Sequence, residues 1–290
     1  MDQIDFNSGN LFDTIYEHLA LPSSTLLGAK ITKKMILENN ELTASDKKLV
    51  NDVVQSVEWL NTLKPDTLNI PTYVDETVEY IEIAVLKVTL KAGATNRGKL
   101  KSAAKLFHSV IPYPLILLLE LDKDVAISLA DKRINQADSS KLVIEHFYNS
   151  QWFNSGMMKG NESLFLNDLS LKNVSRVNYY ELYQDFISKL IALETSYISG
   201  SYLGKKSLAQ SRDEKNDSNA ELEHSEEPQF SKMSNEQKTQ LLKALDVLED
   251  ELSNIRNKLK KEVQMNEKLR LNVQAKKIKQ EISEITSQLA

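Results

Sequence analysis

Cysteine is absent from the 290 residues, which excludes disulfides, thiolate nucleophiles, cysteine-ligated zinc and iron–sulfur clusters. No stretch approaches the roughly 20 consecutive apolar residues that a membrane-spanning helix requires. The chain also starts with acidic residues, where a signal peptide would be basic and then apolar. We therefore expect a cytoplasmic protein of a reducing compartment, with no membrane association.

Glycine and proline are nearly confined to the first two-thirds of the chain. All eight glycines lie at or before Gly204, and neither residue type occurs after Pro228. The stretch 201–232 holds six serines, seven acidic and five basic residues with few apolar ones, a composition typical of a flexible linker. We predict a globular domain over 1–200, a linker over 201–232 and a helical arm over 233–290.

The apolar pattern of the first 200 residues predicts an α+β domain, a mixed sheet with packed helices. A capping signal at Thr43 and apolar residues at helical spacing predict a helix over 44–63. Strands are expected over 78–90, 115–119 and 125–130, with helices following Gly98 and over 178–198. Because 115–119 is apolar throughout, we expect that strand to be buried on both faces.

Heptads over 233–290 predict an α-helical coiled coil. The expected interface consists of Leu241, Leu245, Leu248, Leu252, Ile255 and Leu259, then Leu271, Ile278, Ile282, Ile285 and Leu289. The two series are out of phase, because the first one continues to Glu262, Asn266, Leu269 and Val273. Either the supercoil is locally rewound or the arm folds back as a hairpin. The pattern leaves parallel and antiparallel pairing open, but an apolar stripe this long needs a partner.

Motifs that would indicate catalysis or a cofactor are missing. The sequence has no GxSxG or HExxH motif, and its four histidines stand alone. The segment from Gly156 to Gly160 lacks the Gly-Lys-Ser/Thr ending of a phosphate loop and is interpreted as a surface loop. We predict no catalytic residue, no metal ligand and no cofactor.

One catalytic alternative is an atypical metal-dependent nuclease. Restriction-type nucleases hold a metal with one acid and an acid-x-lysine on a strand. Here Glu79, Glu82 and Lys91 are the candidates, but Thr89 occupies the position of the second acid. Any nuclease of this type would be degenerate.

Basic residues gather in two segments although the net charge is −5. No acid occurs from Ile83 to Leu119, a stretch that contains Lys87, Lys91, Arg97, Lys99, Lys101 and Lys105. Lys101, Lys105 and His108 are predicted to share a helix face opposite the apolar one. A second segment, 256–279, has nine bases and two acids. Such surfaces attract the phosphates of DNA or RNA, although a solvated helix face has the same composition.

Several short blocks follow the order and spacing of a known family. They are Leu21-Pro22-x-Ser24, Ile31-x-Lys33-Lys34, Glu58-Trp59-Leu60, Leu63-Lys64-Pro65-Asp66-Thr67-Leu68-Asn69-Ile70, Ile111-Pro112-Tyr113-Pro114 and Trp152-Phe153. On these residues the chain resembles the bacterial family catalogued as domain of unknown function 4391, over roughly residues 12 to 200. No reaction or catalytic residue comes with that resemblance.

The resemblance indicates which proteins typically occur beside this one, but it indicates no reaction. Proteins of this family typically occur beside DNA methyltransferases and helicases in mobile defence islands. We therefore expect a non-catalytic accessory subunit of a restriction-like or antiphage assembly. Its coiled coil would dimerise or dock a helicase or DNA methyltransferase, and its basic segment would contact DNA backbone. A stand-alone coiled-coil scaffold with an inert domain is the other alternative.

Overall fold

The computed structural model describes residues 10–38, 42–136, 138–204, 233 and 235–289. Nearly all of the predicted linker and the acidic start of the chain lie outside these ranges. The chain divides into two compact units, with the boundary after Leu190. The first, called the globular unit, is described through residue 190. The second contains residues 191–203 and the two C-terminal helices, called the helical hairpin.

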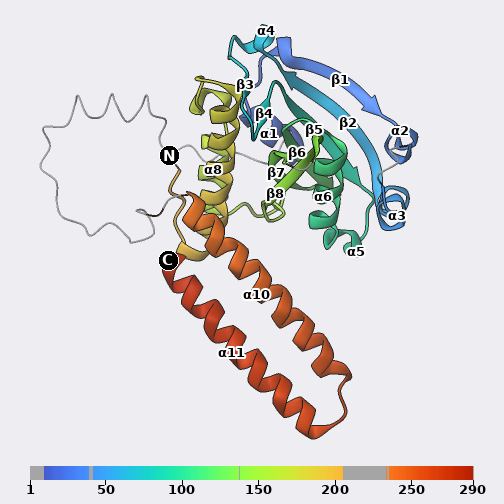
Figure 1. Cartoon of the computed structure of the whole chain (residues 1–290), viewed down its shortest axis with the longest axis vertical. Coiled ribbons are helices and arrows are strands. Elements are labelled where there is room, and N and C mark those ends of the chain that lie inside the picture. Colours follow the sequence, from blue (N-terminus) through green and yellow to red (C-terminus); the bar gives the residue numbers. More distant parts are fainter. Residues whose placement is uncertain (1–9, 39–41, 137, 205–232, 234, 290) are drawn as a thin grey trace, which may run out of the picture. The chain divides into compact units, whose positions relative to one another are not determined.

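Figure 1 shows the elements in sequence colours. The helices before the hairpin are α1 (Leu11–His18), α2 (Lys33–Leu37), α3 (Ala44–Asp52), α4 (Pro65–Leu68), α5 (Ala94–Arg97), α6 (Leu100–Val110), α7 (Gly160–Asp168) and α8 (Tyr179–Ser199), with 3-10 turns at Ser23–Thr25 and Leu171–Asn173. The strands are β1 (Leu26–Ile31), β2 (Val54–Leu63), β3 (Tyr73–Val74), β4 (Glu79–Tyr80), β5 (Ile83–Leu90), β6 (Leu115–Leu121), β7 (Asp124–Asn135) and β8 (Asp138–Asn149).

Six strands form one mixed sheet in the order β1-β2-β5-β6-β7-β8, and β3 pairs with β4 separately. The pair β5–β6 is parallel, and α6 forms its crossover; the other neighbours are antiparallel. The predicted α+β class is therefore confirmed. Because β6 lies inside the sheet and is covered on both sides, Leu115 through Leu119 are all buried, as expected of such a run.

The two faces of the sheet are covered by different helices. Leu86 and Val88 of β5 pack with Ala103 and Phe107 of α6 in one apolar cluster. The other face meets α1, whose Phe12 ring contacts a β5 side chain, and α8, whose Gln184 bonds β7. The alternation of side chains along each strand thus decides which helix a residue faces.

The helix predicted over 44–63 is only half correct. Thr43 and Asp46 do form a reciprocal cap, and α3 begins there. The helix ends at Asp52, however, and residues 54–63 form β2, which pairs with both β1 and β5. Pairing with strands on both sides satisfies the backbone N–H and C=O groups of this segment. This long-range pairing outweighs an apolar spacing that would also suit a helix.

The C-terminal arm consists of α10 (Asn235–Lys261) and α11 (Met265–Leu289). The two helices run antiparallel and side by side (Figure 1), and their apolar residues form one cluster. Of the two arrangements left open by the phase change, the chain therefore adopts the hairpin. No helix within the described ranges is long and apolar enough to cross a membrane.

Candidate functional site

Lys87 lies apart from the rest of its predicted basic cluster. Its ammonium is 3.1 Å from the Glu120 carboxylate on β6 and 3.6 Å from the centre of the Phe12 ring. Both charged side chains are largely buried, with 18% and 12% exposed. Thr89 also donates to Glu120, at 3.0 Å. Lys87 alternates with the residues that face α6, so it lies on the opposite face of the sheet from the α6 lysines.

Lys91 and Arg97 lie at the end of β5 and in α5, and each has a partner within the domain. The Lys91 ammonium donates to the backbone carbonyl of Asn51 at 2.6 Å. The Arg97 guanidinium donates to Asp124 at 2.5 Å and lies over the Trp152 ring. These contacts fix the side chains and neutralise part of the charge at this end of the sheet.

The three remaining lysines are exposed along α6 and at its N-terminal boundary. Lys101 and Lys105 are one turn apart, and Lys99 precedes the helix. Lys99, Lys101 and Lys105 are called the α6 basic surface. The structure therefore brings part of the predicted cluster together and removes Lys87 from it.

The prediction that His108 shares this face is wrong. His108 is 1% exposed, its Nε2 lies 3.0 Å from Ser128 Oγ on β7, and its ring contacts Phe147 on β8. Strands β7 and β8 extend the sheet beneath this side of α6, so the buried arc is wider than the apolar residues indicate. Burial, together with the nearby charge of Lys132, lowers the pKa of His108 well below its ordinary value.

The buried His108 makes the domain sensitive to acid. The unfolded chain takes up a proton near pH 6.5 while the folded chain does not, so the free energy of unfolding falls as the pH drops below 6.5. We expect His108 alone to contribute a loss of about 1.4 kcal/mol per pH unit there. Urea unfolding at pH 7.5 and pH 5.5 measures the change in the free energy of unfolding. His108→Gln should remove the part of this pH dependence that comes from His108.

His18→Gln is the matched control, because His18 is only partly buried and bonds its own helix. This variant should keep the acid-dependent loss of stability that His108 contributes. If the free energy of unfolding falls equally with pH in the wild type and in His108→Gln, the loss does not come from His108 and the prediction is contradicted.

The residues of the nuclease alternative do not come together. Glu82 and Lys91 flank opposite ends of β5, whose eight residues span roughly 26 Å. Glu82 instead lies 3.6 Å from Lys64, and Glu79 is exposed on β4. Among the described residues, no group of three histidine, aspartate or glutamate side chains has a metal-binding arrangement.

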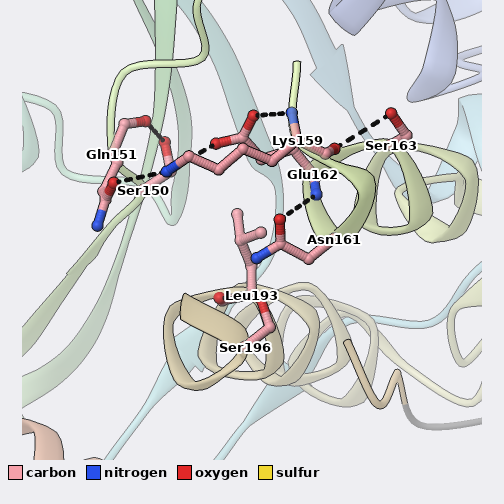
Figure 2. Close-up of polar contacts among 8 residues, drawn as sticks. All are labelled: Ser150, Gln151, Lys159, Asn161, Glu162, Ser163, Leu193 and Ser196. Atoms are coloured by element: carbon pink, nitrogen blue, oxygen red, sulfur yellow. Dashed lines mark hydrogen bonds and ion pairs between the residues drawn. The ribbon is translucent and has the colours of Figure 1, made fainter. Parts of the chain in front are cut away.

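The segment interpreted as a surface loop leads into α7 (Figure 2). Glu162 is nearly fully buried, and its carboxylate accepts from the backbone N–H of Lys159 at 2.9 Å. The Lys159 ammonium lies 3.8 Å from that carboxylate and 3.4 Å from Gln151 Oε1. These contacts cap the helix and hold the ammonium beside it, so they give this segment a structural role.

Inside the helical hairpin, the predicted heptad residues form the seam between the helices. Leu252, Ile255, Leu271, Ala275 and Ile278 form its buried cluster, and Leu248, Leu259 and Ile282 pack against them. Ala275 belongs to the second heptad series, between Leu271 and Ile278. The phase change falls at the connection, where Glu262 accepts from the N–H groups of Val263 and Gln264, both at 2.8 Å. These bonds lower the pKa of Glu262.

Six heptad positions are partly buried when the two helices pack. They are Leu241, Leu245, Leu248, Leu259, Ile282 and Ile285. A second apolar stripe lies on the outer side of α11, where Leu269 is 55% and Val273 70% exposed. These two residues continue the first heptad series, which α11 uses for its outer face instead of its seam.

Charge is unevenly distributed along the hairpin. The part nearest the connection, residues 252–274, contains six basic and two acidic residues. The rest, residues 235–251 and 275–289, contains seven acidic and five basic residues. A groove between the helices near the connection is lined by three cations, Lys258, Lys261 and Arg270, and by three acids, Glu251, Glu262 and Glu267, over the buried Ile255 and Leu271.

The family model described as Domain of unknown function (DUF4391) matches residues 19–282. The chain therefore belongs to this family. The matched range runs past residue 200 and includes α10 and most of α11, beyond the segment whose motifs carry the resemblance. No curated protein and no solved structure matches the chain.

Proposed function

We propose that this chain is a non-catalytic accessory subunit of a cytoplasmic bacterial restriction-like or antiphage assembly, and that the helical hairpin is its assembly element. The observation that carries the proposal is the apolar surface that the hairpin leaves uncovered. The partly buried heptad residues at the edges of the seam, and the exposed Leu269 and Val273 on α11, keep accessible apolar surface in the single chain. Exposed apolar surface is typical of sites of protein association.

The uncovered surface is more than an isolated hairpin needs. Two helices that serve only as a rigid extension would be polar outside their seam, because exposed apolar residues add a risk of aggregation. Leu269 and Val273 instead lie one turn apart, the spacing at which two side chains reach one partner helix. Helical packing with further helices would bury both the seam edges and this stripe.

The resemblance to the family supports the kind of assembly. It implies a setting beside helicases and DNA methyltransferases, which are the partners proposed here. Affinity purification of the tagged full-length chain from its native host, with and without nuclease, tests this. Retention of a helicase or methyltransferase after nuclease treatment is the expected result. Partners that all disappear with nuclease would contradict protein-mediated assembly.

The α6 basic surface is proposed to contact the DNA backbone within this assembly. Its lysines are exposed on α6 and directly before it, and they lie in a part of the sequence, from Ile83 to Leu119, that has no acid. Such a surface supplies affinity through counterion release without reading sequence. Lys87 does not take part in this proposal, because Glu120 neutralises its charge on the other face of the sheet.

Lys99→Glu with Lys105→Glu should weaken DNA binding and reduce its salt dependence. Removing one lysine–phosphate pair lowers the slope of log K against log salt by about 0.9, so a reduction of about two is expected. Fluorescence anisotropy over a salt series measures both quantities. Lys172→Glu, an exposed lysine of the turn at 171–173, is the control and should leave the slope unchanged. Equal slopes for all three proteins would contradict the proposal.

A further inference from the structure

We propose that the outer side of α11 is the docking face for an acidic amphipathic helix of a partner protein. This face consists of Met265, Leu269 and Val273 together with Lys276 and Lys279, and it is called the outer α11 surface. The inference rests on the proposed role of the helical hairpin as the assembly element. It adds where on the hairpin the partner binds and which chemistry the partner presents.

Apolar side chains form a line along this surface. Met265, Leu269 and Val273 follow one another at intervals of four residues, so they span about 12 Å of the helix. Their side chains are 70%, 55% and 70% exposed. Leu271 and Ala275 alternate with them in the sequence and belong to the seam, so packing against α10 leaves the line uncovered. Residues spaced in this way form a ridge that fits the groove of a second helix.

Two lysines continue the outer α11 surface toward the C-terminus. Lys276 lies three residues after Val273, Lys279 follows three residues later, and both are exposed. Within residues 235–289, no acid forms an ion pair with either of them. The neighbouring Lys277 differs, because Glu281 lies 3.7 Å from it. The charge that remains for a partner is therefore positive.

The acidic residues of the hairpin do not neutralise this charge. Those of α10 lie across the seam, and the axes of packed helices are about 8–10 Å apart. The far side of α11 is therefore separated from them by more than the screening length, which is about 8 Å at physiological salt. On α11, residues 265–281 contain five bases and two acids. Both acids lie beside other bases, Glu267 at 3.6 Å from Arg270 and Glu281 beside Lys277.

Three other occupants match these features less well. A second copy offers no acid to Lys276 and Lys279 when two such surfaces meet, so the charges would be unpaired. DNA gains nothing from the apolar line, because its backbone contacts are ionic. A membrane surface binds a helix through a wide apolar face, whereas the larger apolar side of α11 is already used in the seam. Acids beside an apolar stripe on a partner helix satisfy both features at once.

Two synthetic peptides of three heptads test the partner's chemistry on the full-length chain. Both carry leucine at a and d, and they carry either glutamate or lysine at e and g. Fluorescence anisotropy should show that the acidic peptide binds at least about tenfold more tightly than the basic one. Equal affinities for the two peptides, or no binding of either up to about 100 μM, would overturn the proposal.

Lys276→Glu with Lys279→Glu should abolish the preference for the acidic peptide. The matched control is Arg256→Glu with Lys260→Glu, which reverses two exposed bases one turn apart on α10 and should keep the preference. Equal effects of the two double variants would show that the net charge of the hairpin, and not the outer α11 surface, attracts the peptide. That result would overturn the proposal.

Leu269→Ser with Val273→Ser tests the apolar line. This variant should bind the acidic peptide at least about tenfold more weakly, because two apolar side chains no longer leave water on binding. Its helical signal at 222 nm should be unchanged, since neither residue belongs to the seam. Val247→Ser removes an exposed apolar side chain from α10 and should bind like the wild type. Unchanged affinity in the double variant would overturn the proposal.

The assembly in the native host separates this inference from the proposed function. A photo-reactive residue in place of Val273 should cross-link the tagged full-length chain to an acidic helical segment of the helicase or methyltransferase. Cross-links to a second copy or to DNA would overturn the inference. Retention of the helicase or methyltransferase by Leu269→Ser with Val273→Ser would also overturn it, but would leave the proposed function standing. If the wild type retains neither protein, the proposed function itself fails.

Discussion

Replacing Ile255 with aspartate is expected to unfold the helical hairpin while the globular unit stays folded. Ile255 is 5% exposed and packs in the five-residue cluster that holds the two helices together. Losing its side chain costs about 2–5 kcal/mol, and an unpaired carboxylate in the seam adds to that. A hairpin with so few deeply buried residues has little stability in reserve, because isolated helices in water are marginal.

Circular dichroism and urea unfolding measure this outcome. Helices α10 and α11 contribute 27 and 25 helical residues, so the signal at 222 nm should fall strongly. The main unfolding transition of the globular unit should keep its midpoint. Ser253→Asp adds the same charge at an exposed position of the same helix and should behave as the wild type. A full helical signal in Ile255→Asp would show that the seam does not hold the hairpin.

Removing the hydroxyl of Tyr183 should destabilise the globular unit by about 2–4 kcal/mol. This hydroxyl donates to the Leu115 carbonyl at 2.8 Å and accepts from the Ala130 N–H at 3.1 Å. The paired register of β6 with β7 begins only at Leu117 and Ser128, so Tyr183 bonds backbone groups that lie just beyond it. Burial raises the pKa of Tyr183, which keeps the hydroxyl protonated as a donor.

Tyr183→Phe therefore leaves two buried backbone groups unpaired. Urea unfolding at neutral pH measures the change. Tyr180→Phe is the matched control: its ring stacks on Tyr73 and contacts Tyr80 in the same region, and the variant keeps those contacts. We expect the control to lose less than about 1 kcal/mol. Equal losses of stability in both variants would mean that the hydrogen bonds of the Tyr183 hydroxyl to β6 and β7 contribute little.

Much of the fold could be predicted from local pattern where one strong signal dominates. The apolar run from Leu115 to Leu119 is central and buried, and the heptads do pair two helices. The segment around Trp59 was misjudged because helical and extended structure both suit its apolar spacing, and only pairing with β1 and β5 decides between them. Such long-range pairing leaves no trace in a short window of sequence.

The candidate site shows the same division between local and tertiary information. The exposed lysines of α6 follow from helical spacing alone. His108 does not, because the strands that bury it come later in the chain. The pairing of Lys87 with Glu120 was missed although a signal exists, since each is a lone charge in an otherwise apolar strand. Glu120 is the residue that ends the acid-free stretch, and neighbouring central strands place it beside Lys87.

The hairpin is proposed to join this chain to its assembly. The most direct measurement is affinity purification of the tagged full-length chain from its native host after nuclease treatment, with the wild type and Ile255→Asp compared at matched expression. We expect a helicase or methyltransferase to be retained by the wild type and lost from Ile255→Asp, while Ser253→Asp retains it. Equal recovery with Ile255→Asp and the wild type would contradict the claim, because assembly would then not depend on the hairpin.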